Sequence, residues 1–108
     1  MESKYFKRKK SKYFKPIYYK KSYYIKNAKN KKRKMLLTEN EIYLLFKNKC
    51  YYCGIYPNPL NGIDRIDNKD DYEIDNVVSC CSTCNYMKGT LSLNNFICQI
   101  IKIYNYNK

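Results

Sequence analysis

The sequence contains no histidine and no tryptophan among its 108 residues, and only three glycines and three prolines. The absence of histidine excludes every site that needs an imidazole, the usual general base near neutral pH. No apolar run approaches the roughly 20 residues that cross a membrane, and the N-terminus lacks the apolar segment of a secretory signal. We therefore expect no membrane partner, no small-molecule cofactor and no secretion. The expected setting is intracellular and reducing: the nucleus, an organelle matrix, or a viral or cytoplasmic compartment.

Acidic residues are nearly absent from the first third of the chain. Residues 1–34 hold fifteen of the 22 Lys and Arg residues and a single acid, a net charge of +14. The remaining 74 residues hold seven basic and eight acidic side chains, a net charge of −1. Like charges at this density repel one another. We therefore predict an intrinsically disordered basic arm over residues 1–36, followed by one domain over residues 37–108.

Eight aromatic residues are interleaved with the cations of this arm. Lys and Arg replace the counterions of phosphates, and Tyr and Phe stack on exposed bases. The combination favours a tether for DNA or RNA over a solubilising tail or a nuclear-import signal. The predicted nucleic-acid contacts are Lys4, Lys7, Arg8, Lys12, Lys15, Lys31, Lys32, Arg33 and Lys34.

Two Cys-x-x-C pairs, Cys50/Cys53 and Cys81/Cys84, stand 27 residues apart. Four thiolates at this spacing can close a tetrahedral shell around Zn²⁺. Two disulfides would need an oxidising compartment, which nothing in the sequence suggests. A structural Zn²⁺ would also support the modest core of so short a chain. We predict one zinc ion, with Cys80 and Cys98 outside its shell as packing residues.

The second half of the chain predicts an α+β fold. Thr38 and Glu41 have the spacing of a capping box, which predicts a helix over about residues 39–48. Alternating apolar and polar residues over 63–67, and a returning run over 76–80, predict a β-hairpin. A helix over 81–88 would carry the second cysteine pair, and Ser92 would cap a final helix. The apolar stripe of that final helix is expected to pack against the hairpin and the first helix; it consists of Leu93, Phe96, Ile97, Ile100, Ile101 and Tyr104.

A zinc knuckle, a hairpin and a helix in this order, closed by NVVSCCSTCNYMKG, resemble the HNH endonuclease family over residues 37–104. The resemblance implies a small zinc-stapled ββα-metal (HNH-like) domain with flanking helices. It further implies that Asp64 and Asn85 hold Mg²⁺ or Mn²⁺, that Asn76 braces the hairpin loop, and that Lys88 faces phosphate.

Arg65 stands where the family has its catalytic histidine. Arginine stays protonated and cannot act as a general base. Asp67, two residues along the strand and thus expected on the same face as Asp64, is a candidate second metal ligand or base. Alternatively, a metal-bound water needs little help from a base while Arg65 holds the phosphate. A further alternative is that Asp64, Arg65 and Asp67 form only a surface ion pair and turn caps.

Two functions therefore remain open. The first is a divalent-metal-dependent endonuclease that hydrolyses phosphodiester bonds. The second is a catalytically inactive, zinc-binding RNA- or DNA-binding component of a ribonucleoprotein (ribosome-like) or viral particle, and so part of a large complex. In both, the partner is nucleic acid. No predicted helix is rich in base-reading side chains, so we expect weak sequence selectivity.

Overall fold

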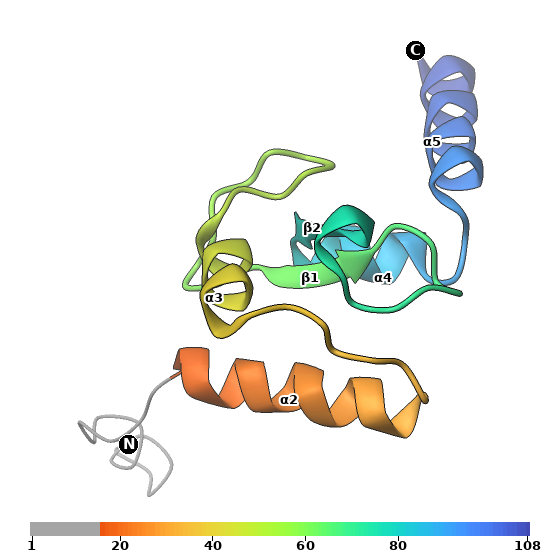
Figure 1. Cartoon of the computed structure of the whole chain (residues 1–108). Helices are drawn as coiled ribbons and strands as arrows, with labels where there is room; N and C mark the ends of the chain where they lie inside the picture. Colours follow the sequence, from red (N-terminus) through yellow and green to blue (C-terminus); the bar gives the residue numbers. More distant parts are fainter. Residues whose placement is uncertain (1–15) are drawn as a thin grey trace, which may run out of the picture.

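The computed structural model describes residues 16–108, with side chains from Lys20 onward. A two-stranded antiparallel hairpin lies at the centre, with helices beside it (Figure 1). The observed order confirms the predicted α+β class and the strand–strand–helix unit. In chain order the elements are α2 (Pro16–Asn30), α3 (Glu39–Lys47), β1 (Gly62–Arg65), the 3-10 turn η1 (Ile74–Asn76), β2 (Val77–Cys80), α4 (Ser82–Lys88) and α5 (Leu93–Asn107).

The hairpin and α3 share one small core. Strand β1 pairs with β2 in a register that places Gly62 opposite Cys80 and Arg65 opposite Val77. Ile63 of β1 packs with Ile42 and Phe46 of α3. The predicted capping box of α3 is confirmed, since Thr38 and Glu41 each accept a hydrogen bond from the backbone N–H of the other. This core holds the hairpin in place beneath the site described below.

Helix α2 corrects the predicted disordered arm over residues 16–36. Tyr24 and Ala28, one helical turn apart, are buried in the core against α3 and β1. The Tyr24 hydroxyl accepts a hydrogen bond of 2.9 Å from the backbone N–H of Ile63. A side chain at Gly62 would collide with this hydroxyl, which explains the glycine there. Lys21, whose side chain is only 18% exposed, adds an ion pair with Glu39 of α3, while Lys26 and Lys29 remain in solvent.

The segment after α2 is also part of the fold. Tyr72 donates its backbone N–H to the carbonyl of Lys34 at 2.9 Å, and Leu36 donates to the carbonyl of Tyr72 at 2.8 Å. Residues up to 36 therefore contact the hairpin loop directly. The remaining arm contacts predicted from the sequence lie outside the described residues; they are Lys4, Lys7, Arg8, Lys12 and Lys15.

Helix α5 also differs from expectation. Only Phe96, in its first turn, is buried, with its ring edge-on to Tyr52 at 5.4 Å. Ile97 and Ile100 are 38% and 37% exposed, and Ile101 is 52% exposed. The turn after α4 directs the helix away from the hairpin, and beyond its first turn no other element of the described residues lies beside it (Figure 1). Within residues 16–108, no helix is long and apolar enough to cross a membrane.

Candidate functional site

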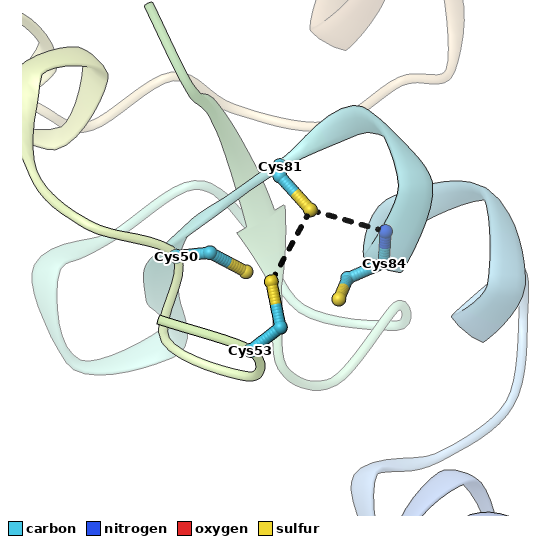
Figure 2. Close-up of side chains that lie close together, drawn as sticks. All are labelled: Cys50, Cys53, Cys81 and Cys84. Carbon is cyan, nitrogen blue, oxygen red and sulfur yellow. Dashed lines mark hydrogen bonds between the residues drawn. The ribbon is translucent and has the colours of Figure 1, made fainter. Parts of the chain in front are cut away.

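The four predicted zinc ligands converge from two elements of the fold (Figure 2). Cys50 and Cys53 lie in a tight turn, which Gly54, at φ +78°, closes by donating its backbone N–H to the Cys50 carbonyl at 2.9 Å. A positive φ of this kind favours glycine. Cys81 caps the N-terminus of α4, and Cys84 lies in its first turn. The hairpin therefore brings two short turns, far apart in sequence, into contact.

The sulfur positions fit zinc. All four Sγ atoms lie within 4.8 Å of one another, and those of Cys53 and Cys81 are 3.7 Å apart. A tetrahedral ion with Zn–S bonds of 2.3 Å would separate its sulfurs by about 3.8 Å. All six cysteines are free, including Cys80 and Cys98, which lie outside the cluster. The predicted arrangement of the four cysteines for metal binding is confirmed.

The electrostatics of the cluster favour a cation. Burial raises the pKa of Cys50, but backbone N–H groups of Cys81, Cys53 and Tyr52 outweigh it and lower that pKa to about 6. Burial and the neighbouring thiols instead raise the pKa of Cys84. Four thiolates cannot share so small a space without a compensating charge, and Zn²⁺ would supply it.

Asp64 of β1 lies at the centre of a second, buried polar cluster. Its carboxylate is only 4% exposed. The hydroxyl of Tyr52 donates to Oδ2 at 2.6 Å. The Lys88 ammonium forms an ion pair with the same oxygen at 3.3 Å and donates to the carbonyl of Arg65 at 3.2 Å. A buried charge needs such a partner, and α4 supplies it.

The prediction that Lys88 faces phosphate is therefore corrected, because its side chain is fully buried. The sequence does contain a signal for this position. Lys88 follows Cys84 by four residues on α4, so the two side chains share the inward face of the helix. Tyr52 was missed as well. It stands between the cysteines of the first pair, and burial and the Asp64 carboxylate raise its pKa, which keeps it protonated as a donor.

An open cleft of about 730 Å³ lies over this cluster. Asp64 and Asn85, the predicted pair of metal ligands, both line it, as does Arg65. Tyr23 and Asn27 of α2 also line the cleft, as does Lys31 just after the end of that helix. The structure thus brings the two predicted ligands to one site, next to a helix that the sequence analysis did not predict.

Arg65 and Asn76 hold the hairpin loop. The Arg65 guanidinium donates to the carbonyls of Asn68 and Asp70 and lies 5.1 Å from the centre of the Tyr72 ring. The Asn76 amide donates to the carbonyls of Asp67 and Asp71 and accepts from the Asp67 N–H at 2.9 Å. Asn76 therefore occupies the bracing position that the resemblance implied.

Asp67 does not join Asp64. Strand β1 ends at Arg65, so the alternation that placed both carboxylates on one face stops before Asp67. Its side chain is exposed, accepts from the N–H of Lys69 at 2.9 Å, and borders a different depression. The prediction that Asp67 is a metal ligand beside Asp64 is therefore corrected, because the Asp67 side chain caps the loop.

The basic residues after α2 have two kinds of position. Lys31, Lys32 and Lys34 are exposed. Arg33 is half-buried, and its Nε donates to the carbonyl of Asn68 at 3.2 Å. The lysines are therefore available to a partner, while Arg33 helps to fix the loop.

Comparisons with known proteins identify the fold. No protein-family model matches the chain. A segment of 73 residues, 67% of the chain, is 48% identical to the uncharacterized protein R423 of Acanthamoeba polyphaga mimivirus, and the chain spans only 14% of that protein. The structure is similar to that of the rare-cutting HNH restriction endonuclease PacI, with a TM-score of 0.66 and 20% identity over 80% of this chain and 75% of that one. The chain therefore has the fold of an HNH endonuclease, as the sequence motifs suggested.

Proposed function

We propose that this chain, built on the HNH fold, binds nucleic acid and hydrolyses its phosphodiester bonds as a divalent-metal-dependent endonuclease. One observation carries the proposal: Asp64 and Asn85 line the same cleft, and a cationic helix borders it. A carboxylate and an amide oxygen are ligands suited to Mg²⁺ or Mn²⁺. The cations of α2 are suited to the phosphates of a bound strand.

The residues present fit such an ion. Mg²⁺ is commonly held by one or two protein oxygens together with substrate phosphates and water. A carboxylate offers about four acceptor positions, and Tyr52 and Lys88 contact Asp64 without filling them all. When bound, the ion would polarise the phosphate and lower the pKa of a coordinated water.

The chain's own residues would act around this ion in distinct ways. Tyr52 and Lys88 hold the Asp64 carboxylate in one orientation beneath the cleft. Arg65 uses one of its nitrogens on the loop carbonyls, which leaves other donors for a phosphate oxygen. Because it keeps its proton, Arg65 would act through its charge and not as a base.

The proposal is tested by incubating zinc-loaded protein with supercoiled plasmid and with end-labelled RNA, in Mg²⁺ or Mn²⁺. Asn85→Ala should reduce cleavage at least tenfold without touching the buried ion pair. Asp64→Asn should abolish cleavage, with zinc content and circular dichroism measured to show that the domain remains folded. Asp67→Asn, outside the cleft, is the matched control and should cut like the wild type. Equal rates for Asn85→Ala and Asp67→Asn would contradict the proposal.

A second function is favoured by a different observation. Lys88 already neutralises Asp64, and no histidine is available as a base. Both features suit a module that binds nucleic acid without cutting it, such as a component of a ribonucleoprotein or viral particle. This function replaces the first if the wild type binds labelled DNA or RNA but leaves both intact in Mg²⁺ and Mn²⁺.

A further inference from the structure

Helix α2 and the residue that follows it present three side chains to the cleft in a regular row. Tyr23, Asn27 and Lys31 are spaced four residues apart, and the backbone N–H of Lys31 donates to the Asn27 carbonyl at 3.1 Å, so the helical spacing continues past Asn30. The three side chains therefore share one face and extend over about 12 Å along the helix axis. All three line the cleft that contains Asp64 and Asn85. We call them the α2 row. Tyr24 and Ala28, each one position further along the chain, lie on the adjacent face of α2, which enters the core.

The α2 row is free to meet a ligand. Tyr23 is 61% exposed, and its ring is held edge-on against Tyr24 at 5.3 Å. Asn27 is half-buried and Lys31 is exposed. Within the part of the chain that the structure describes, no hydrogen bond joins either of these two side chains to another group.

These three groups together match the parts of one nucleotide. An exposed aromatic ring stacks on a base, a carboxamide pairs with a base edge, and an ammonium neutralises a phosphate. The cleft volume of about 730 Å³ lies within the usual range for ligand sites, about 300–1,000 Å³. The row lines the same cleft as the predicted metal ligands, so the nucleotide would lie near the phosphate that the ion contacts.

We propose that the α2 row is a binding site for one unstacked nucleotide of the strand in the cleft, with Tyr23 on the base, Asn27 at its edge and Lys31 at a phosphate. A base inside an intact duplex cannot reach the tyrosine ring. The site therefore prefers single-stranded or locally unpaired nucleic acid, whether DNA or RNA. The inference rests on the nucleic-acid binding proposed above, but not on cleavage.

The absence of tryptophan permits a direct test. Tyr23→Trp places the only indole of the protein in the cleft, and stacking on a base should quench its fluorescence. The full chain, zinc-loaded and carrying this substitution, is titrated with single-stranded DNA, single-stranded RNA and duplex DNA while anisotropy of the labelled strand reports binding. Tyr104→Trp, on the exposed part of α5, is the matched control. We expect quenching by the single strands for Tyr23→Trp alone.

Alanine variants test the other contacts. Tyr23→Ala should weaken single-strand binding about fivefold or more, and Tyr23→Phe should restore it. Lys31→Ala should weaken binding more than Lys26→Ala, which removes the same charge from an exposed position of α2 outside the cleft. In the same way, Asn27→Ala should weaken binding more than Asn30→Ala.

The outcomes separate this inference from the nuclease proposal. If the Tyr23→Trp variant binds nucleic acid but its fluorescence is not quenched, the proposed nucleotide site at the α2 row is wrong. The proposed nuclease activity is then not affected. Quenching in a protein that cuts nothing supports the row and removes the nuclease. If the wild type binds no nucleic acid, both the nucleotide site and the nuclease proposal are wrong.

Discussion

The two long helices at the ends of the described chain behave in opposite ways. Helix α2 carries many lysines and no acid, yet its Tyr24 and Ala28 are buried in the core and its Lys21 forms an ion pair with Glu39 of α3. Helix α5 has a regular apolar stripe, yet beyond Phe96 its isoleucines stay exposed. The comparison shows that an apolar stripe alone does not place a helix in the core. A helix docks only where the path of the chain brings it next to another apolar surface.

The energetics agree with this contrast. Burying one large aromatic side chain contributes about 1.5–3 kcal/mol, and the Tyr24 hydroxyl adds its hydrogen bond to β1. These contacts add to the helix's own backbone hydrogen bonds and to the Lys21–Glu39 ion pair, and together they dock α2 on the domain. A helix of 15 residues without tertiary contacts is only marginally stable in water.

Removing zinc should have the largest effect, because a structural zinc contributes about 10–16 kcal/mol of apparent binding free energy in small zinc domains. Chelation should unfold the hairpin and take away the surface on which α2 docks. Hydrogen exchange followed by mass spectrometry should then show α2 protected only with zinc bound. In dilute protein, α5 beyond Ile97 should exchange quickly in both states. Strong zinc-dependent protection of α5 would contradict the contrast.

Tyr24→Ala should destabilise the domain by about 3–5 kcal/mol, since it opens a cavity in the core and leaves the Ile63 N–H without its partner. Tyr23→Ala, at the adjacent but exposed position, should change stability by less than about 0.5 kcal/mol. Urea unfolding of the two zinc-loaded variants measures the difference. Similar midpoints would show that α2 is not docked through Tyr24.

Alkaline pH should weaken the same contact. Burial raises the pKa of Tyr24 to about 12, although its hydrogen bond from Ile63 opposes the shift. A folded pKa above the unfolded value means that this stability is complete below pH 10 and is lost as pH rises towards 12, in total about 2–3 kcal/mol. The control Tyr24→Phe lacks the ionisable hydroxyl, so its unfolding free energy should fall less over this range. Parallel pH profiles would refute the assignment.

Charged substitutions on α5 should have the smallest effect. Ile100→Lys and Ile101→Lys change exposed positions, so each should alter the unfolding free energy by less than about 0.5 kcal/mol. Ala28→Lys, which places a charge at a residue only 1% exposed on α2, should prevent folding or cost several kcal/mol. Thermal unfolding of the three variants provides the comparison. A loss above 1 kcal/mol for an α5 variant would mean that the stripe packs in solution.

Local patterns made much of this structure predictable. The two Cys-x-x-C pairs predicted the zinc cluster, because each short turn can present two sulfurs to one ion whatever surrounds it. The capping box of Thr38 and Glu41 predicted the start of α3, because all of its partners lie within four residues. The hairpin followed from alternation on both sides of a turn-rich segment. In each of these cases the deciding contacts are short in sequence or imposed by the metal.

Contacts between distant segments decided the rest. The docking of α2 depends on Tyr24 meeting Gly62 and Ile63, and no pattern within a basic helix reveals that meeting. Asp64 gained its buried partner Lys88 only when α4 folded back onto β1, and Asp67 left the site because the strand ended two residues earlier than alternation suggested. The sequence alone determined which groups can bind a metal, cap a helix or stay charged. The tertiary structure decided which of them are buried, because burial depends on neighbours that the chain brings together from far apart.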